Sequence, residues 1–230
     1  KDSPIRQGQK PTQKAATKSS KVTLIQAAGL VPEPIDWLWP GWLAQGKIHI
    51  LGGAPGSGKT TICMKLAAIV SSGGNWPDGD MVQPGNVIIW SGEDDAKDTL
   101  LPRLIASGAD TNRIYFVGEC KAGEETRSFD PSTDIEALKT AIDQIGGAAL
   151  IVIDPIVNAI SGDSHKNAEV RRSLQPLADL AAACKAAVVG ITHLTKGTTG
   201  RDPLERLTGS LAFGAVPRLA MIAAKEAETE

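Results

Sequence analysis

Short apolar runs alternate with longer mixed segments along the chain from residue 22 onward. Each run is continuously apolar rather than alternating with polar residues, which is typical of strands buried on both faces of a parallel sheet. Turn residues separate the runs from the segments that follow them. The predicted strands are 47–52, 86–91, 113–118, 148–154, 186–193 and 218–224.

Segments with helical spacing lie between these runs. Alternating strands and helices predict an α/β fold in which helices cover both faces of a mostly parallel sheet. In open sheets of this kind ligands bind at the carboxyl ends of the strands, so residues at those ends are the first candidates for function. The predicted helices are 59–72, 95–107, 132–145, 166–184 and a short one near 205–213.

Residues 1–21 differ from the rest of the chain. They carry six basic side chains against one acid, Asp2, and almost no large apolar residue, so they cannot form a core. We expect a flexible basic tail or linker here and a single domain over residues 22–230; contact between the tail and nucleic acid is an alternative. The chain begins at Lys1 rather than Met, which leaves room for an upstream domain in a longer chain.

Composition narrows the class of protein. The chain has 230 residues, of which 42% are hydrophobic, enough for a sizeable core. No apolar run approaches the roughly 18 to 20 residues needed to cross a bilayer, and the first residues lack the apolar centre of a signal peptide. The three cysteines are widely spaced, which argues against a disulfide framework or a zinc site. We therefore expect a cytoplasmic protein without membrane contact.

A glycine-rich motif gives the strongest chemical signal. The sequence GAPGSGKTT fits the pattern G-x-x-x-x-G-K-[ST] and lies between a predicted strand and a predicted helix. Such a loop curls its backbone N–H groups around a phosphate chain, the lysine reaches the β- and γ-phosphates, and the hydroxyl binds Mg²⁺. ATP and Mg²⁺ are therefore expected. The residues expected to bind the nucleotide are Gly53, Ala54, Pro55, Gly56, Ser57, Gly58, Lys59, Thr60 and Thr61.

Besides the hydroxyl of the glycine-rich loop, a carboxylate is needed to hold the metal from the side opposite that loop. The apolar run GGAALIVID ends in Asp154, so Thr60 and Asp154 are the predicted metal site, with Asp154 acting through water. The alternative is an acid that merely ends a strand.

Hydrolysis also needs a base to deprotonate the attacking water. The position after Asp154 is Pro155, so the base must come from elsewhere, and the strand after the phosphate loop ends in WSGEDD. One of the three acids at positions 93–95 is therefore a candidate. The alternative is that the acids only cap the next helix, whose positive end they favour.

These motifs together resemble the RecA-type P-loop ATPases, and within them the RepA-like hexameric replicative helicases of plasmids, phages and mobile elements. The resemblance covers residues 36–224 and rests on the order of GAPGSGKTT, WSGEDD, ALIVIDPIVNAISGDSHKN, VVGITHLTKG and RLTGSLAFGAVPR. It implies a RecA-like fold, with Glu93 as the catalytic base and Asp94 beside it. It also implies that His193 senses the γ-phosphate, although a lone histidine can be purely structural.

The resemblance further implies a ring in which an arginine of one subunit completes the site of its neighbour. Arg218 fits this position best and Arg103 is the second candidate, although either could form a surface ion pair instead. Two polar loops, 157–167 and 194–210, correspond to loops that grip single-stranded DNA, and neither holds an aromatic residue for base stacking. The candidate DNA-binding residues are Lys166, Lys196, Arg201 and Arg206.

Tryptophans are concentrated in IDWLWPGWLAQG, which holds Trp37, Trp39 and Trp42. We expect these rings to pack over the sheet edge or against a neighbouring subunit. Stacking on adenine is the alternative.

The resulting prediction is an ATP-hydrolysing hexameric DNA helicase or translocase that acts in the replication of a plasmid, phage or mobile element. Single-stranded DNA and further copies of the chain are the expected partners. The main alternative is a RecA-type ATPase of the recombination or clock kind, which remodels DNA or protein without unwinding. A small-molecule kinase and a nucleotide-dependent assembly module also remain open.

Overall fold

A computed structural model describes residues 23–123, 125–162, 166–195, 200, 206–207 and 212–225. The chain forms two units, Lys1–Pro34 and Ile35–Glu230. The described part of the first unit is exposed and carries one 3₁₀ turn, η1 (Ala27–Gly29). The predicted division between residues 21 and 22 falls outside the described residues and stays a prediction.

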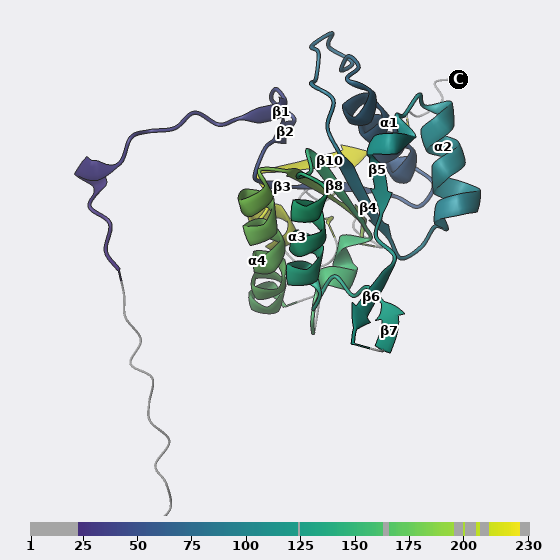
Figure 1. Ribbon diagram of the computed structural model, residues 1–230. Helices are drawn as coiled ribbons and strands as arrows, with labels where there is room; N and C mark the ends of the chain where they lie inside the picture. Colours follow the sequence, from purple (N-terminus) through teal and green to yellow (C-terminus); the bar gives the residue numbers. More distant parts are fainter. Residues whose placement is uncertain are drawn as a thin grey trace, which may run out of the picture. The chain divides into compact units, whose positions relative to one another are not determined.

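The second unit is built on a six-stranded sheet in which every neighbouring pair is parallel, as predicted (Figure 1). The strand order is β10-β3-β9-β8-β4-β5. The strand β9 therefore lies between β3 and β8, although it comes last of the three along the chain. The bounds are β3 (Ile48–Gly53), β4 (Val87–Ser91), β5 (Ile114–Phe116), β8 (Leu150–Asp154), β9 (Ala187–His193) and β10 (Leu219–Ala223).

Helices cover both faces of this sheet, with α1 and α2 on one side and α3 and α4 on the other (Figure 1). Each face has its own apolar core, because the side chains of β3, β4, β8 and β9 point alternately to the two faces and are almost all buried. The helices are α1 (Lys59–Ser72), α2 (Leu101–Ala106), α3 (Ile135–Gln144), α4 (Asn167–Cys184) and α5 (Ala212–Ala215). A π-helical turn, η2 (Ala96–Leu100), leads into α2. Two 3₁₀ turns, η3 (Thr111–Arg113) and η4 (Ile156–Ala159), precede β5 and follow β8.

Two glycines fix how these layers meet. Gly73 adopts the left-handed conformation (φ 70°) and donates its N–H to Ile69, which ends α1 after Ser72. Gly190 of β9 has no side chain to clash with η4, because a Cβ there would lie 2.8 Å from the Cβ of Ile156. The turn that follows β8 can therefore pack directly on β9.

Two small hairpins were not predicted from the sequence. One pairs β1 (Trp37–Trp39) with β2 (Leu43–Ala44), and the other pairs β6 (Glu119–Ala122) with β7 (Glu125–Ser128). The described side chains of β7 are all exposed, so no apolar pattern marks this strand in the sequence. Within the described residues, no helix is both long and apolar enough to cross a membrane.

The first hairpin takes part in a stack of three indole rings. The Trp39 ring lies 5.2 Å from that of Trp42 and 4.9 Å from that of Trp76, measured between centroids. The indole of Trp39 donates to Asp78 (2.7 Å) and that of Trp76 donates to the carbonyl of Leu38 (3.0 Å). Trp76 follows the carboxyl end of α1, about 21 Å along that helix from the glycine-rich loop. The stack therefore packs the hairpin, and the alternative that these rings stack on adenine of the same subunit is not supported.

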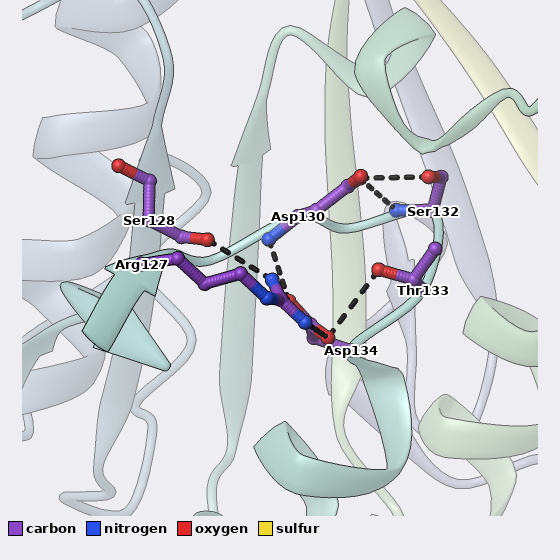
Figure 2. Close-up of polar contacts among 6 residues, drawn as sticks. All are labelled: Arg127, Ser128, Asp130, Ser132, Thr133 and Asp134. Atoms are coloured by element: carbon purple, nitrogen blue, oxygen red, sulfur yellow. Dashed lines mark hydrogen bonds and ion pairs between the residues drawn. The ribbon is translucent and has the colours of Figure 1, made fainter. Parts of the chain in front are cut away.

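The second hairpin is fastened to the start of α3 by a two-pronged ion pair (Figure 2). The guanidinium of Arg127 donates to both carboxylate oxygens of Asp134, each at 2.6 Å, and the backbone N–H of Asp130 donates to the same carboxylate at 2.9 Å. Asp134 is only 7% exposed. The hydrogen bonds from Arg127, followed by that from Asp130, lower the pKa of Asp134 from its ordinary 3.8 to about 2.

We expect Asp134→Asn to lower the melting temperature at pH 7 by several degrees, because the variant loses the charge that Arg127 binds. A carboxyl group with a lowered pKa stabilises the fold above its unfolded pKa and loses this effect as pH falls through the folded value. The difference between the two proteins should therefore shrink between about pH 4 and pH 2. Thermal unfolding across this pH range measures it. Asp143→Asn, which breaks the exposed pair with Lys139, is the control and should change little; an equal effect of both variants would contradict the prediction.

Candidate active site

The glycine-rich loop between β3 and α1 forms a tight turn. Gly56 and Gly58 have positive φ angles of 72° and 87°, which favour glycine over any residue with a side chain. At Gly53 a Cβ atom would collide with the hydroxyl of Ser57 and lie 2.7 Å from the carbonyl oxygen of Ala223. The backbone can follow this path only with glycines at these places, and it opens onto the amino end of α1, where phosphate groups bind favourably.

Lys59 lies across the mouth of this loop. Its ammonium group donates to the carbonyls of Gly53 (3.1 Å) and Ala54 (3.0 Å) and lies 3.4 Å from Nδ1 of His193. Burial lowers the pKa of Lys59, and the nearby carboxylates of Asp154 and Glu93 partly oppose that shift. A partly desolvated cation at this place is suited to bind the phosphates of a nucleotide.

The sheet order brings four strand ends together at one edge. Gly53 of β3 is paired with His193 of β9, and Ser91 of β4 is paired with Asp154 of β8. Because β9 also pairs with β8, the order along the edge is loop, histidine, aspartate, serine. The predicted site residues on these strands are therefore neighbours in space.

The predicted metal ligands are in direct contact. The Thr60 hydroxyl donates to Oδ2 of Asp154 at 2.9 Å, and Asp154 is 4% exposed. Burial raises the pKa of Asp154, the hydrogen bond from Thr60 opposes the rise, and the negative charges of Glu93 and Asp94 add to it. A hydroxyl and a buried carboxylate beside a phosphate-binding loop are ligands that suit Mg²⁺ bound with phosphate and water. These residues fit the metal that the sequence predicts.

The turn after β4 is held by its own serine. The Ser91 hydroxyl accepts the backbone N–H groups of Glu93 (3.3 Å) and Asp94 (2.9 Å), and the N–H of Gly92 donates to the carbonyl of Asp154 (2.7 Å). A Cβ atom at Gly92 would lie 3.0 Å from the amide nitrogen of Asn158. Sequence reasoning missed this contact, and the only signal for it was the glycine directly before the acids.

The three acids of this turn have different surroundings. Asp95 caps η2 by accepting the N–H groups of Lys97 (2.7 Å) and Asp98 (3.1 Å), and these hydrogen bonds lower its pKa. Asp94 forms an ion pair with Arg103 at 3.2 Å. The helix-capping interpretation thus fits Asp95.

Glu93 points instead toward the end of β9. Its Oε1 lies 3.7 Å from Nε2 of His193, and both side chains are about half exposed. His193 therefore stands between Lys59 on one side and Glu93 on the other. This arrangement places a carboxylate, an imidazole and an ammonium group around the mouth of the glycine-rich loop.

The remaining candidates lie in several places. Arg103 is engaged by Asp94 of its own chain, whereas the exposed Arg218 lies just before β10, with its backbone N–H donating to Ile48 (2.7 Å). Lys166 is exposed and lies 3.3 Å from Glu169. Arg206 lines a cavity together with residues of the glycine-rich loop. Lys196 and Arg201 lie outside the described residues, and their DNA-binding role stays a prediction.

Comparison with known proteins identifies a family. The family model described as AAA domain matches residues 12–199, which is well over half of the chain and includes every site residue on β3, β4, β8 and β9. A comparison with curated proteins found no match. The family match and the parallel, helix-flanked sheet agree with the predicted RecA-like P-loop NTPase fold.

We expect Gly53→Ala to destabilise the protein by about 1 to 3 kcal/mol and to weaken nucleotide binding, because the added methyl group has no room beside Ser57 and Ala223. Urea unfolding and titration with a fluorescent nucleotide measure the two effects. Gly118→Ala is the control, since no atom lies within 4 Å of its added Cβ. Equal behaviour of the two variants would show that the close packing at Gly53 is unimportant.

Proposed function

Because the chain belongs to the AAA domain family of P-loop ATPases, we propose that this site hydrolyses ATP and that hydrolysis drives movement along single-stranded DNA during replication of a plasmid, phage or other mobile element. The observation that carries the ATPase part is the 2.9 Å contact between Thr60 and Asp154 beside Lys59, with Glu93 and His193 3.7 Å apart at the same edge. The DNA part rests on the resemblance to RepA-like helicases.

The glycine-rich loop and Lys59 bind the phosphates of ATP, and Thr60 and Asp154 hold the magnesium ion. When bound, Mg²⁺ neutralises charge on the phosphates and orients them. Lys59 now donates to two loop carbonyls. It exchanges these neutral acceptors for charged phosphate oxygens, which form stronger hydrogen bonds with an ammonium group.

Glu93 is the general base in this proposal. Asp154 is engaged by Thr60, Asp95 by the helix cap and Asp94 by Arg103, whereas Glu93 makes the longer, 3.7 Å contact with His193 at the mouth of the glycine-rich loop. It accepts a proton from the water that attacks the terminal phosphate, and ADP and phosphate are the products. Its partial exposure leaves room for that water.

His193 links phosphate binding to the base. It lies within 3.4 Å of the Lys59 ammonium and 3.7 Å from the Glu93 carboxylate, at the end of the strand that leads into the second polar loop. A change in Lys59 contacts on nucleotide binding reaches Glu93 through this ring. The same movement shifts the start of the loop after β9.

A neighbouring copy of the chain completes the site. Glu93 and His193 are about half exposed, whereas phosphoryl transfer benefits from exclusion of bulk water and from an added positive charge. We assign that charge to Arg218, whose exposed side chain is available to another subunit, in a ring that we propose to be a hexamer. Arg103 is less suited because Asp94 already engages it.

The polar loops that follow β8 and β9 are proposed to contact DNA. Both start at the edge of the sheet that carries the site, so movement there reaches them directly. The positive charge for the phosphates of a single strand comes from Lys166, Lys196, Arg201 and Arg206, and such contacts carry little sequence preference.

We expect Glu93→Gln to keep ATP binding and to lower the rate of turnover roughly 100-fold or more, because the amide cannot accept the proton of water. Steady-state phosphate release measures turnover, and calorimetric titration with ATP measures binding.

The matched control is Asp95→Asn, two residues away. Asparagine is also a good helix cap, so this variant should hydrolyse ATP at close to the parental rate. Normal hydrolysis by Glu93→Gln would show that the base lies elsewhere.

We expect single-stranded DNA to raise the rate of ATP hydrolysis severalfold and the effect to fade with added salt, because phosphate contacts release counterions. The measurement is phosphate release with oligonucleotides of differing sequence, which should act alike. Lys59→Ala is the control, since it should show no turnover with or without DNA.

A ring-forming preparation that is not stimulated by DNA would refute the translocase proposal. Strand displacement then separates the two proposed classes. ATP-dependent strand displacement supports a helicase. ATP turnover that DNA stimulates without any strand displacement supports a RecA-type ATPase that remodels DNA without unwinding.

A further inference from the structure

The acidic turn, residues 91–95, is joined to the segment that follows β8. Ser91 at the end of β4 is paired with Asp154 at the end of β8, so the two chains leave the sheet side by side. Beyond the sheet, the backbone N–H of Gly92 donates to the carbonyl of Asp154 at 2.7 Å. The position of Glu93 therefore depends on the segment after β8 as well as on its own turn.

A side chain from that segment occupies the space beside Gly92. A Cβ atom at residue 92 would lie 3.0 Å from Nδ2 of Asn158 and 3.1 Å from the ring edge of Trp90. Both distances are shorter than the roughly 3.5 to 4.0 Å of an ordinary carbon contact. Trp90 is buried, whereas Asn158 is exposed. Gly92 thus packs against an amide and an indole, and a larger residue there would have to displace one of them.

The short turn η4 fixes Asn158 in this place. Ile156 and Ala159 lie three residues apart, on the same side of a 3₁₀ turn, and both are buried. Ile156 fills the space over Gly190 of β9, where an added Cβ would collide with it. The core thus anchors one side of η4, while Asn158 on the exposed side reaches the acidic turn.

Glu93 depends on its backbone for its direction. Its contact with His193, at 3.7 Å, is longer than the roughly 2.7 to 3.2 Å of a hydrogen bond. The carboxylate of a long, half-exposed side chain is therefore directed mainly by the peptide from which it extends. A displacement of about 1 Å in a reacting group can cost roughly 100-fold in rate. What holds the peptide before Glu93 consequently matters for the reaction.

We propose that Asn158 is a positioning residue for Glu93. Its amide fills the space beside Gly92 and holds the peptide that leads into Glu93, so that the carboxylate stays at the mouth of the glycine-rich loop. The inference rests on the proposed role of Glu93 as the general base. It assigns to Asn158 an effect on the base and no contact with the nucleotide.

An amide suits a place beside three acids. It is polar, so it tolerates exposure to water. It is also uncharged, so it neither binds Glu93 as a lysine would nor adds to the negative charge of the turn as another carboxylate would. A neutral side chain can therefore fix the shape of the acidic turn without changing the charge around the base.

The test replaces Asn158 by alanine, which removes the amide and leaves every proposed ligand of the nucleotide in place. We expect Asn158→Ala to lower kcat roughly tenfold and to leave the KM for ATP unchanged, because the base is displaced while phosphate binding is intact. Phosphate release across a range of ATP concentrations measures both constants. Asn75→Ala, at an exposed position in the loop after α1, is the matched control and should change neither constant. Asn158→Ser, which also removes the amide, should behave like Asn158→Ala and takes its place if the alanine variant fails to fold.

Combined variants separate positioning from a general loss of structure. In Glu93→Gln protein, whose residual turnover no longer uses the base, Asn158→Ala should cause no further loss. Gly92→Ala should also lower kcat, because its methyl group crowds Asn158. The double variant Gly92→Ala/Asn158→Ala should lose less than the product of the two single losses, since each change makes room for the other.

A further tenfold loss on adding Asn158→Ala to Glu93→Gln protein would show that Asn158 acts independently of the base, and would overturn the inference. Unchanged kcat in Asn158→Ala, or a higher KM with kcat unchanged, would overturn it too. Normal hydrolysis by Glu93→Gln alone would instead refute the proposed base, and this failure is distinguishable because Asn158 is intact in that protein. A loss of kcat that disappears in the Glu93→Gln background supports the inference.

Discussion

The site depends on the position of β9 between β3 and β8. This insertion separates the strand of the glycine-rich loop from the strand of Asp154 by one strand width, and Thr60 on α1 spans the gap to reach the carboxylate at 2.9 Å. It also places His193, at the end of β9, between Lys59 and Glu93. A sheet with β3 next to β8 would leave no place for that histidine.

The turn after β4 separates three adjacent acids by giving them different partners. Asp95 accepts hydrogen bonds from backbone N–H groups, Asp94 forms an ion pair with Arg103, and Glu93 lies beside His193. Ser91 and Gly92 make this possible because the serine binds two backbone N–H groups and the glycine passes close to Asn158. The geometry of this short turn thus gives each of three neighbouring acids a different role: helix capping, ion pairing and the proposed proton transfer.

The elements that could be predicted from sequence are those whose signal is local. The four inner strands of the sheet, β3, β4, β8 and β9, are mostly apolar because both of their faces are buried, and α1 is bounded by Gly58 and Gly73. The hairpin of β6 and β7 could not be found this way, since it depends on the contact of Arg127 with Asp134 rather than on an apolar pattern. In the site, strand ends predicted which residues meet. The close packing of Leu207 on Gly52, by contrast, is encoded by no local pattern.

The distribution of tryptophans has an optical consequence. Four of the five lie on the first hairpin or in the loop after α1, far from the strand ends of the site. Trp90 is the exception, because its ring edge lies close to Gly92 and its indole packs against Phe129 with centroids 6.3 Å apart. The protein therefore carries an intrinsic fluorophore at the turn that holds Glu93, and removal of the other indoles would isolate the emission of this one ring as a label-free signal of the turn's conformation.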